Sequence, residues 1–346
     1  MRMRAFFTSA IAMMNRLKYP QKFALISAIF VVPIILLVYL LFSDIYNQIN
    51  LDQKKILGNV YLAPLQEIWV TIPEIQLLNT HGTQQEQIQK EWLEKELDQK
   101  INILAQQEKQ LNNIFKTADY FQNIQQIWQR LKQDQKQWSI ETIDYFYNHF
   151  LNEIENLRVT IGNESNLIFD PYAASYYLID VNLLTLPKMQ KILGDIKSVC
   201  VKAMITEKFT PNDYTQLLML LSLYKNYSIQ LMKNVEFAFH NLADTPTPKL
   251  IENWRKFTIN INQINMLMNQ LIYGINIPEP VIYFNVADQN LKQSIIFGNN
   301  VISELDILLQ HRVNMLWSKM IDLGILIIMV LSIAIYLFIC FYLGVM

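Results

Sequence analysis

Residues 23–42 read FALISAIFVVPIILLVYLLF, an uncharged run of twenty mostly apolar residues. An α-helix rises 1.5 Å per residue, so this run forms about 30 Å of helix, the thickness of the hydrocarbon core of a bilayer. The residues that follow, SDIYNQ, lack the small-x-small pattern of a signal-peptide cleavage site, although a cleaved signal peptide is the alternative interpretation. We therefore predict a transmembrane helix over 23–42.

The C-terminal end carries a second uncharged run, LGILIIMVLSIAIYLFICFYLGVM over 323–346. Trp317 and Lys319 precede it at the position of interfacial anchors, so this run too is expected to span. Residues 1–22 have no acidic side chain, which predicts a cytoplasmic N-terminus by the positive-inside rule and an extracytoplasmic domain over 43–322. The basic residues of this N-terminal segment are Arg2, Arg4, Arg16, Lys18 and Lys22.

The composition favours helix and excludes nucleic-acid binding. Hydrophobic residues make up 52% of the chain, and eight Gly and eleven Pro are few for the many turns that a β-sheet protein needs. All 30 acidic residues but only 24 of the 29 basic ones fall in 44–322, so the large domain is net acidic. A net acidic domain outside the cytoplasm is a poor partner for nucleic acid.

Catalytic and metal-binding patterns are missing from the sequence. It contains no GxSxG, Walker loop, HExxH, CxxC or Gly-rich dinucleotide turn, and its four histidines lie far apart. We expect neither an enzyme nor a cofactor or metal ion. The two cysteines, Cys200 and Cys340, cannot form a disulfide within the large domain. Cys200 is predicted to be a small buried apolar residue, with an intersubunit disulfide or redox role as the alternative.

The region between the apolar runs is predicted to be a succession of long helices, because apolar residues recur in steps of three and four. Heptad seams over 143–161, 214–242 and 250–275 are typical of coiled coils and four-helix bundles. The fold class is therefore all-α, a four-helix-bundle type of domain, with two stacked modules as an option, between two transmembrane helices. The expected helices cover 44–79, 86–131, 140–166, 171–206, 211–243, 249–276 and 281–321, the first and last running into the spans.

Two segments resemble the sensory half of methyl-accepting chemotaxis proteins and related bacterial transmembrane sensors. The first is NRLKYPQKFALI at 15–26, leading through the span to QKKILGNVYLAPLQEI at 53–68; the second is SNLIFDPYAASYYLIDVNLLTLP at 165–187. With the layout of span, helical domain and span, the resemblance covers nearly the whole chain. Such input modules are joined to chemotaxis signalling domains, histidine kinases or cyclases, so the resemblance does not name the output.

The resemblance implies a homodimer in the bacterial inner membrane with a periplasmic sensor domain. A small organic ligand or a periplasmic binding protein would shift the last helix relative to the first, and the membrane lipid would surround both spans. The family continues past its second span with a HAMP linker and a signalling domain, whereas this sequence stops at Met346. It is therefore expected to be a sensor module whose output lies outside this chain.

The segment DPYAASYYLID at 170–180 is the candidate ligand site. Asp170 is expected to cap a helix whose first-turn N–H groups can receive an anion, with the polar tips of Tyr176, Tyr177 and Asp180 nearby. Arg158, on the preceding helix, could supply a cation for a carboxylate. The structural alternative is an ordinary cap, tyrosines in the core and a hydrogen-bonded acid.

A membrane scaffold or accessory subunit is the competing function. Polysaccharide chain-length regulators also bracket a helical extracytoplasmic domain with terminal spans, but their second span follows a proline-rich approach. Residues 281–346 contain no proline, which favours the sensor.

Overall fold

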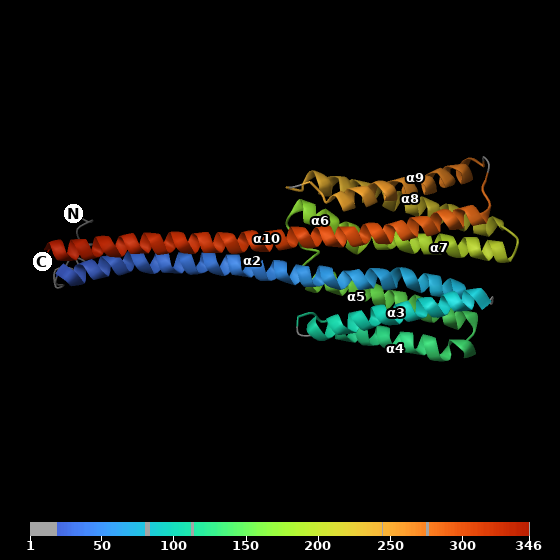
Figure 1. Cartoon of the computed structure of the whole chain (residues 1–346), viewed down its shortest axis with the longest axis horizontal. Coiled ribbons are helices and arrows are strands. Elements are labelled where there is room, and N and C mark those ends of the chain that lie inside the picture. Colours follow the sequence, from blue (N-terminus) through green and yellow to red (C-terminus); the bar gives the residue numbers. More distant parts are fainter. Residues whose placement is uncertain (1–18, 80–83, 112–113, 244, 275–276, 346) are drawn as a thin grey trace, which may run out of the picture. The chain divides into compact units, whose positions relative to one another are not determined.

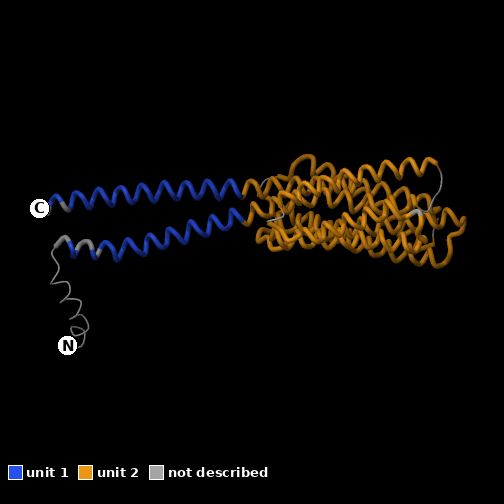
Figure 2. Tube along the Cα trace, turned by 90° about the horizontal axis from the view of Figure 1, so that it is seen from below, with its two compact units in different colours: residues 1–50, 313–346 blue, residues 51–312 orange. Residues whose placement is uncertain are grey.

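The computed structural model describes residues 19–79, 84–111, 114–243, 245–274 and 277–345. Within these residues the chain is helical and has no strand, which confirms the predicted all-α class. The chain divides into two compact units, residues 1–50 with 313–346 as unit 1 and residues 51–312 as unit 2 (Figure 2). Of the basic N-terminal residues, Arg2, Arg4, Arg16 and Lys18 lie outside the described part of the chain.

Unit 1 consists of parts of the two longest helices, α2 (Tyr19–Leu78) and α10 (Pro280–Val345). Each contains a stretch that is long and apolar enough to cross a membrane, and almost none of the residues in these stretches is buried within the protein. Exposed apolar surface of this extent is unfavourable in water and is matched by a lipid environment. The chain thus has two candidate membrane-spanning helices, at the positions predicted from the apolar runs.

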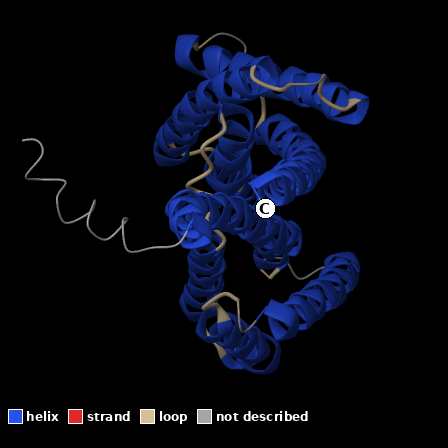
Figure 3. Cartoon of the chain, turned by 90° about the vertical axis from the view of Figure 1, so that its left-hand side faces the viewer, coloured by secondary structure: helices blue, strands red, loops and turns tan. Residues whose placement is uncertain are grey.

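Unit 2 contains two antiparallel helical bundles that lie side by side (Figures 1 and 3). The first bundle is formed by α2 from residue 51 onward and α3 to α5; the second is formed by α6 to α9 and by α10 up to residue 312. The two modules therefore lie beside each other within unit 2, and are not stacked end to end. The remaining elements are α3 (Gln84–Leu111), α4 (Ala118–Asp134), η1 (Gln135–Gln137), α5 (Ile140–Glu164), α6 (Ala173–Asp180), η2 (Val181–Thr185), α7 (Leu186–Ile205), α8 (Pro211–His240) and α9 (Pro248–Tyr273).

The predicted heptad seams form the core of unit 2. In α5, α8 and α9 the positions three and four apart point inward, as the narrow apolar stripes require. Burying one such aliphatic or aromatic side chain stabilises the fold by about 1.5–3 kcal/mol. The fully buried members are Tyr147, Phe150, Ile154, Leu157, Ile161, Leu217, Leu221, Tyr224, Ser228, Leu231, Val235, Leu250, Phe257, Ile261 and Leu271. Cys200 is also buried, as predicted.

Ser139, Asp170 and Thr210 each precede a predicted helical run and are expected to cap it, and the structure confirms two of these three caps. The Ser139 side chain accepts the Thr142 N–H at the start of α5, and Thr210 forms a complete capping box with Asp213 at the start of α8. The prediction that Asp170 caps a helix was wrong. That helix, α6, begins at Ala173 with Tyr172 as its N-cap residue, because the Asp170 carboxylate is bound by other groups.

The single helix expected over 86–131 is also wrong, because the chain reverses between α3 and α4. Phe115 in the reversal is buried in the core, and Thr117 Oγ1 donates to Glu108 Oε1 at 2.8 Å. The Tyr61 hydroxyl donates to the same carboxylate at 2.7 Å, so Glu108 fastens the reversal to α2. A tertiary contact of this kind does not change the helical spacing of apolar residues, so the sequence pattern does not reveal the reversal.

Proline lacks a backbone N–H, so Pro64, Pro73 and Pro187 are each expected to bend or interrupt their helices, and an interruption is present at one of the three. The π-helical turn η2 directly precedes Leu186 and Pro187, where the missing proline N–H removes a regular hydrogen bond, so the predicted interruption is confirmed there. Pro64 and Pro73 lie inside α2, which continues through both as an uninterrupted helix.

Candidate functional site

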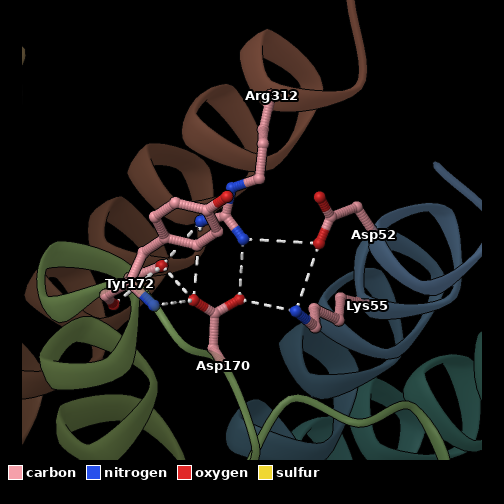
Figure 4. A network of polar contacts seen from close by, with 6 residues as sticks. Asp52, Lys55, Asp170, Tyr172 and Arg312 are labelled. Atoms are coloured by element: carbon pink, nitrogen blue, oxygen red, sulfur yellow. Dashed lines mark hydrogen bonds and ion pairs between the residues drawn. The ribbon is translucent and has the colours of Figure 1, made fainter. Parts of the chain in front are cut away.

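Four charged side chains meet at the end of unit 2 where α2 enters it and α10 leaves it (Figure 4). Asp52 and Lys55 lie on α2, Arg312 lies on α10, and Asp170 lies in the loop between α5 and α6. The cluster contains two cations and two anions, so its formal charge is zero. It joins three segments that are far apart in the sequence.

Asp170 is the centre of this ionic cluster. Lys55 Nζ donates to Asp170 Oδ2 at 2.8 Å and to Asp52 Oδ1 at 3.1 Å. Arg312 Nη1 donates to Asp170 Oδ2 at 2.9 Å and to Asp52 Oδ1 at 3.3 Å. Both cations therefore contact both anions, and a shift of α10 changes the two contacts that Arg312 makes with Asp170 and with Asp52 on α2.

The Arg312 guanidinium is also fixed by two uncharged neighbours. Its Nη2 donates to Ser175 Oγ at 2.8 Å, and Ser175 Oγ in turn donates to Asp170 Oδ1 at 2.6 Å. The ring of Tyr172 lies across the guanidinium, with 3.9 Å between the ring centroid and the guanidinium carbon (Figure 4). A planar guanidinium binds a carboxylate and an aromatic face at the same time, which an ammonium group cannot do with the same geometry.

Water has little access to the cluster. The side chain of Asp170 is 0% exposed, that of Lys55 6% and that of Arg312 12%. Burial by itself would raise the pKa of the Asp170 carboxyl, but hydrogen bonds from Arg312, Lys55 and Ser175 together hold this pKa below its usual range. Asp170 is therefore ionised at neutral pH, and removing any one charge leaves a buried partner uncompensated.

The chain reaches this geometry through a close contact between α2 and the α5–α6 loop. An added Cβ at Gly58 would lie 2.4 Å from Ser165 Cβ, so only glycine fits there. Asn166 has a φ of 60°, which turns the loop back toward Asp170. Lys55 and Gly58 belong to one of the two segments that resemble bacterial sensors, and Ser165 and Asp170 belong to the other. These two segments thus pack against each other.

Arg158 is not the cation that binds Asp170. It is buried on α5, with its guanidinium carbon 4.6 Å from the centroid of the Trp69 ring and its ion pair to Glu155 stretched to 3.8 Å. Burial lowers the pKa of Arg158 to about 10, although Glu155 raises it. Its role as a cation for a ligand carboxylate therefore stays a prediction.

The other predicted ligand residues, Tyr176, Tyr177 and Asp180, lie on α6, which packs against α8. Asp180 accepts hydrogen bonds from Thr185 and Asn234, and the ring of Tyr177 stacks on Phe237 at 5.2 Å between centroids. Tyr176 is partly exposed and meets Tyr177 edge to face. The structure therefore does not bring the five predicted residues into one site, and ligand binding by any of them stays a prediction.

Sequence reasoning missed Asp52, Lys55 and Arg312. The spacing of three between Asp52 and Lys55 indicates an ion pair on one helix face, and such pairs are common on exposed surfaces. Nothing local shows that this face meets Asp170, which is 115 positions away from Lys55.

No family model matches this chain, and neither a curated protein nor a solved structure matches it. Among the described residues no group of His, Cys, Asp or Glu side chains is arranged to hold a metal ion. The fold and the cluster define the class: an all-helical protein in which two candidate membrane-spanning helices flank a helical region. This layout is compatible with a sensor.

Proposed function

We propose that this chain is the input module of a bacterial transmembrane receptor of the chemoreceptor type. In this proposal unit 2 lies on the periplasmic side of the inner membrane and senses a small molecule or a protein partner. The conformational change passes along α10 to the cytoplasmic side, and the chain carries out signalling without catalysis.

The observation that carries this proposal is the continuity of α2 and α10. Each is one uninterrupted helix that contributes to the core of unit 2 and also contains a candidate span. A helix without a break resists bending and compression, so a shift of its part inside unit 2 is carried along its axis. A scaffold does not need this arrangement, whereas a receptor does.

The ionic cluster supports the proposal as the point where the two helices are held in register. Lys55 on α2 and Arg312 on α10 share the carboxylate of Asp170. A displacement of α10 relative to α2 must break or exchange these buried contacts, which favours two discrete arrangements over a gradual one.

Polar contacts between α2 and α10 continue inside unit 2. Asn59 Nδ2 donates to the carbonyl oxygen of Ile302 at 2.8 Å, and the buried Gln66 side chain lies against Gly298. Buried polar contacts of this kind specify one register, because a shift of one helix leaves a buried polar group without its partner. A change of register between these helices therefore takes place between discrete arrangements, as at the ionic cluster.

A receptor chimera tests the function. The chain is joined after Met346 to a HAMP linker and a histidine-kinase reporter, and kinase output is compared for the Asp170→Asn and Arg312→Gln variants. We expect a change in basal output of about threefold or more, because loss of about 0.7 kcal/mol from one of two states changes their ratio by that factor. Glu252→Gln, which removes an exposed carboxylate from α9, is the matched control. Equal output from all variants at equal abundance would count against signalling and favour the scaffold.

The orientation has a separate test. Lys256 lies on the exposed face of α9, and Lys256→Cys provides a labelling site in unit 2 in a chain with Cys200→Ser and Cys340→Ser. A membrane-impermeant maleimide should label this cysteine in cells whose outer membrane alone is permeable. Labelling that requires rupture of the inner membrane would place unit 2 in the cytoplasm.

A further inference from the structure

A cleft of about 750 Å³ lies between the two bundles, at the opposite end of unit 2 from the ionic cluster. Its walls come from the last turns of α2, the start of α3, the end of α7 and the first turns of α10. Its size is within the range of pockets that take small molecules. It differs from the segment 170–180 in position and in composition.

Three charged groups in this cleft repeat the pattern of the ionic cluster. Lys197 Nζ, on α7, donates to Glu74 Oε1 at 3.1 Å and to Asp288 Oδ1 at 2.5 Å. Glu74 belongs to α2 and Asp288 to α10. One ammonium group thus joins the two helices that carry the candidate spans.

The carboxylates, and not this ammonium group, face the open space of the cleft. The side chain of Lys197 is 4% exposed, whereas those of Glu74 and Asp288 are 27% and 22% exposed. Lys292 reaches Asp288 Oδ2 at 2.7 Å from outside. With Glu86, the charged groups that line the cleft are three carboxylates and two ammonium groups, so its net charge is negative.

Aromatic faces add a second attraction for a cation. The Lys197 ammonium already lies 5.2 Å from the centroid of the Phe284 ring, at the distance of a cation–π contact. Trp92, on the α3 wall, is 60% exposed and provides another large face. An anion would meet the carboxylates before it reached the buried ammonium, whereas a cation is attracted by the carboxylates and the rings together.

We propose that this cleft binds a small organic cation, an ammonium compound with an aromatic or aliphatic body. The ammonium group lies between Glu74 and Asp288, and the apolar body packs on Trp92 and Phe284. Such a ligand competes with Lys197 for both carboxylates and so changes the tie between α2 and α10. This inference rests on the proposed function, for which it names the ligand class.

Binding is measured by calorimetry on the full chain in lipid nanodiscs with three probes of similar shape. Phenylethylamine is a cation at neutral pH, phenylacetate is an anion, and phenylethanol is neutral. We expect saturable binding of phenylethylamine below about 1 mM, with phenylethanol and phenylacetate at least tenfold weaker, as for a charge-assisted contact. Stronger binding of phenylacetate, or no binding of the amine up to 10 mM, overturns the proposal.

Two variants locate the site. Glu74→Gln should weaken amine binding tenfold or more, and Trp92→Leu, an exposed change that leaves the buried ion pairs intact, should weaken it about 3- to 30-fold. Glu252→Gln on α9 should leave binding unchanged. Binding that Trp92→Leu and Glu74→Gln both leave unchanged places the amine elsewhere and refutes this site.

The two proposals fail separately. Amine binding in the nanodisc without any change in kinase output from the chimera contradicts the receptor function and leaves the site standing. A chimera that responds to changes in the ionic cluster but binds no amine contradicts the cleft and leaves the receptor function standing.

Discussion

Asp170→Asn is the most direct test of the ionic cluster. The substitution keeps the size of a side chain that is 0% exposed, but it removes the charge that Lys55 and Arg312 share. Loss of one partner from a buried ion pair costs roughly 3–5 kcal/mol. Asp52 still contacts both cations, so we expect the lower end, about 3 kcal/mol of the free energy of unfolding.

For a domain of this size, about 3 kcal/mol corresponds to a fall in Tm of about 6 to 12 °C. Circular dichroism at 222 nm on the detergent-solubilised chain measures it, with the exposed Glu252→Gln as a control that leaves Tm unchanged. Adding Lys55→Met to Asp170→Asn should recover part of the loss, because Arg312 and Asp52 then balance each other. A fall of less than 2 °C for Asp170→Asn, or a double variant that loses the sum of both single effects, would refute the charge-compensation argument.

Three further outcomes follow from the same structure. The pKa of Asp170 is lower in the folded than in the unfolded chain, so its carboxylate contributes to the free energy of unfolding above about pH 4, and this contribution is lost as the pH falls through the folded pKa. Urea titrations between pH 3 and pH 7 should show this loss, and Asp170→Asn should abolish the part that is due to this carboxylate. Gly58→Ala should destabilise unit 2 by about 1–2 kcal/mol, since its Cβ collides with Ser165, whereas Gly194→Ala meets only ordinary contacts and should stabilise by up to about 1 kcal/mol in the same urea titration. Burial raises the pKa of Cys200 to about 12, so iodoacetamide at pH 8 should alkylate it only in denaturant, and fast alkylation of the native Cys340→Ser chain would contradict the packing.

Local patterns in the sequence predicted the two apolar runs and most of the helices. The run at 23–42 has the length and polarity of a span, and the capping box from Thr210 to Asp213 marks where α8 begins. These signals act over a few neighbouring residues, so they can be read without knowing what packs against them. The division of 86–131 into α3 and α4 was missed because it is stabilised by a tertiary contact, between Glu108 at the end of α3 and Tyr61 on α2.

The candidate sites depended on contacts that no local pattern contains. The sequence singles out Asp170, but its predicted helix-capping role was wrong, and Arg158 contacts Trp69 and Glu155. Its actual partners come from the beginning and end of unit 2, brought together by packing of α2, α10 and the α5–α6 loop.

By itself the sequence determined an all-helical chain with two apolar runs and inward-facing heptad seams, because hydrophobic periodicity and helix caps act within one element. Only the tertiary structure decided which charges meet. An ion pair needs atoms within about 4 Å, and Lys55 and Arg312, which are 115 and 142 positions from Asp170, reach it only because packing brings α2, α10 and the α5–α6 loop together. The same holds for Glu74, Lys197 and Asp288, which form one cleft because the two bundles lie side by side.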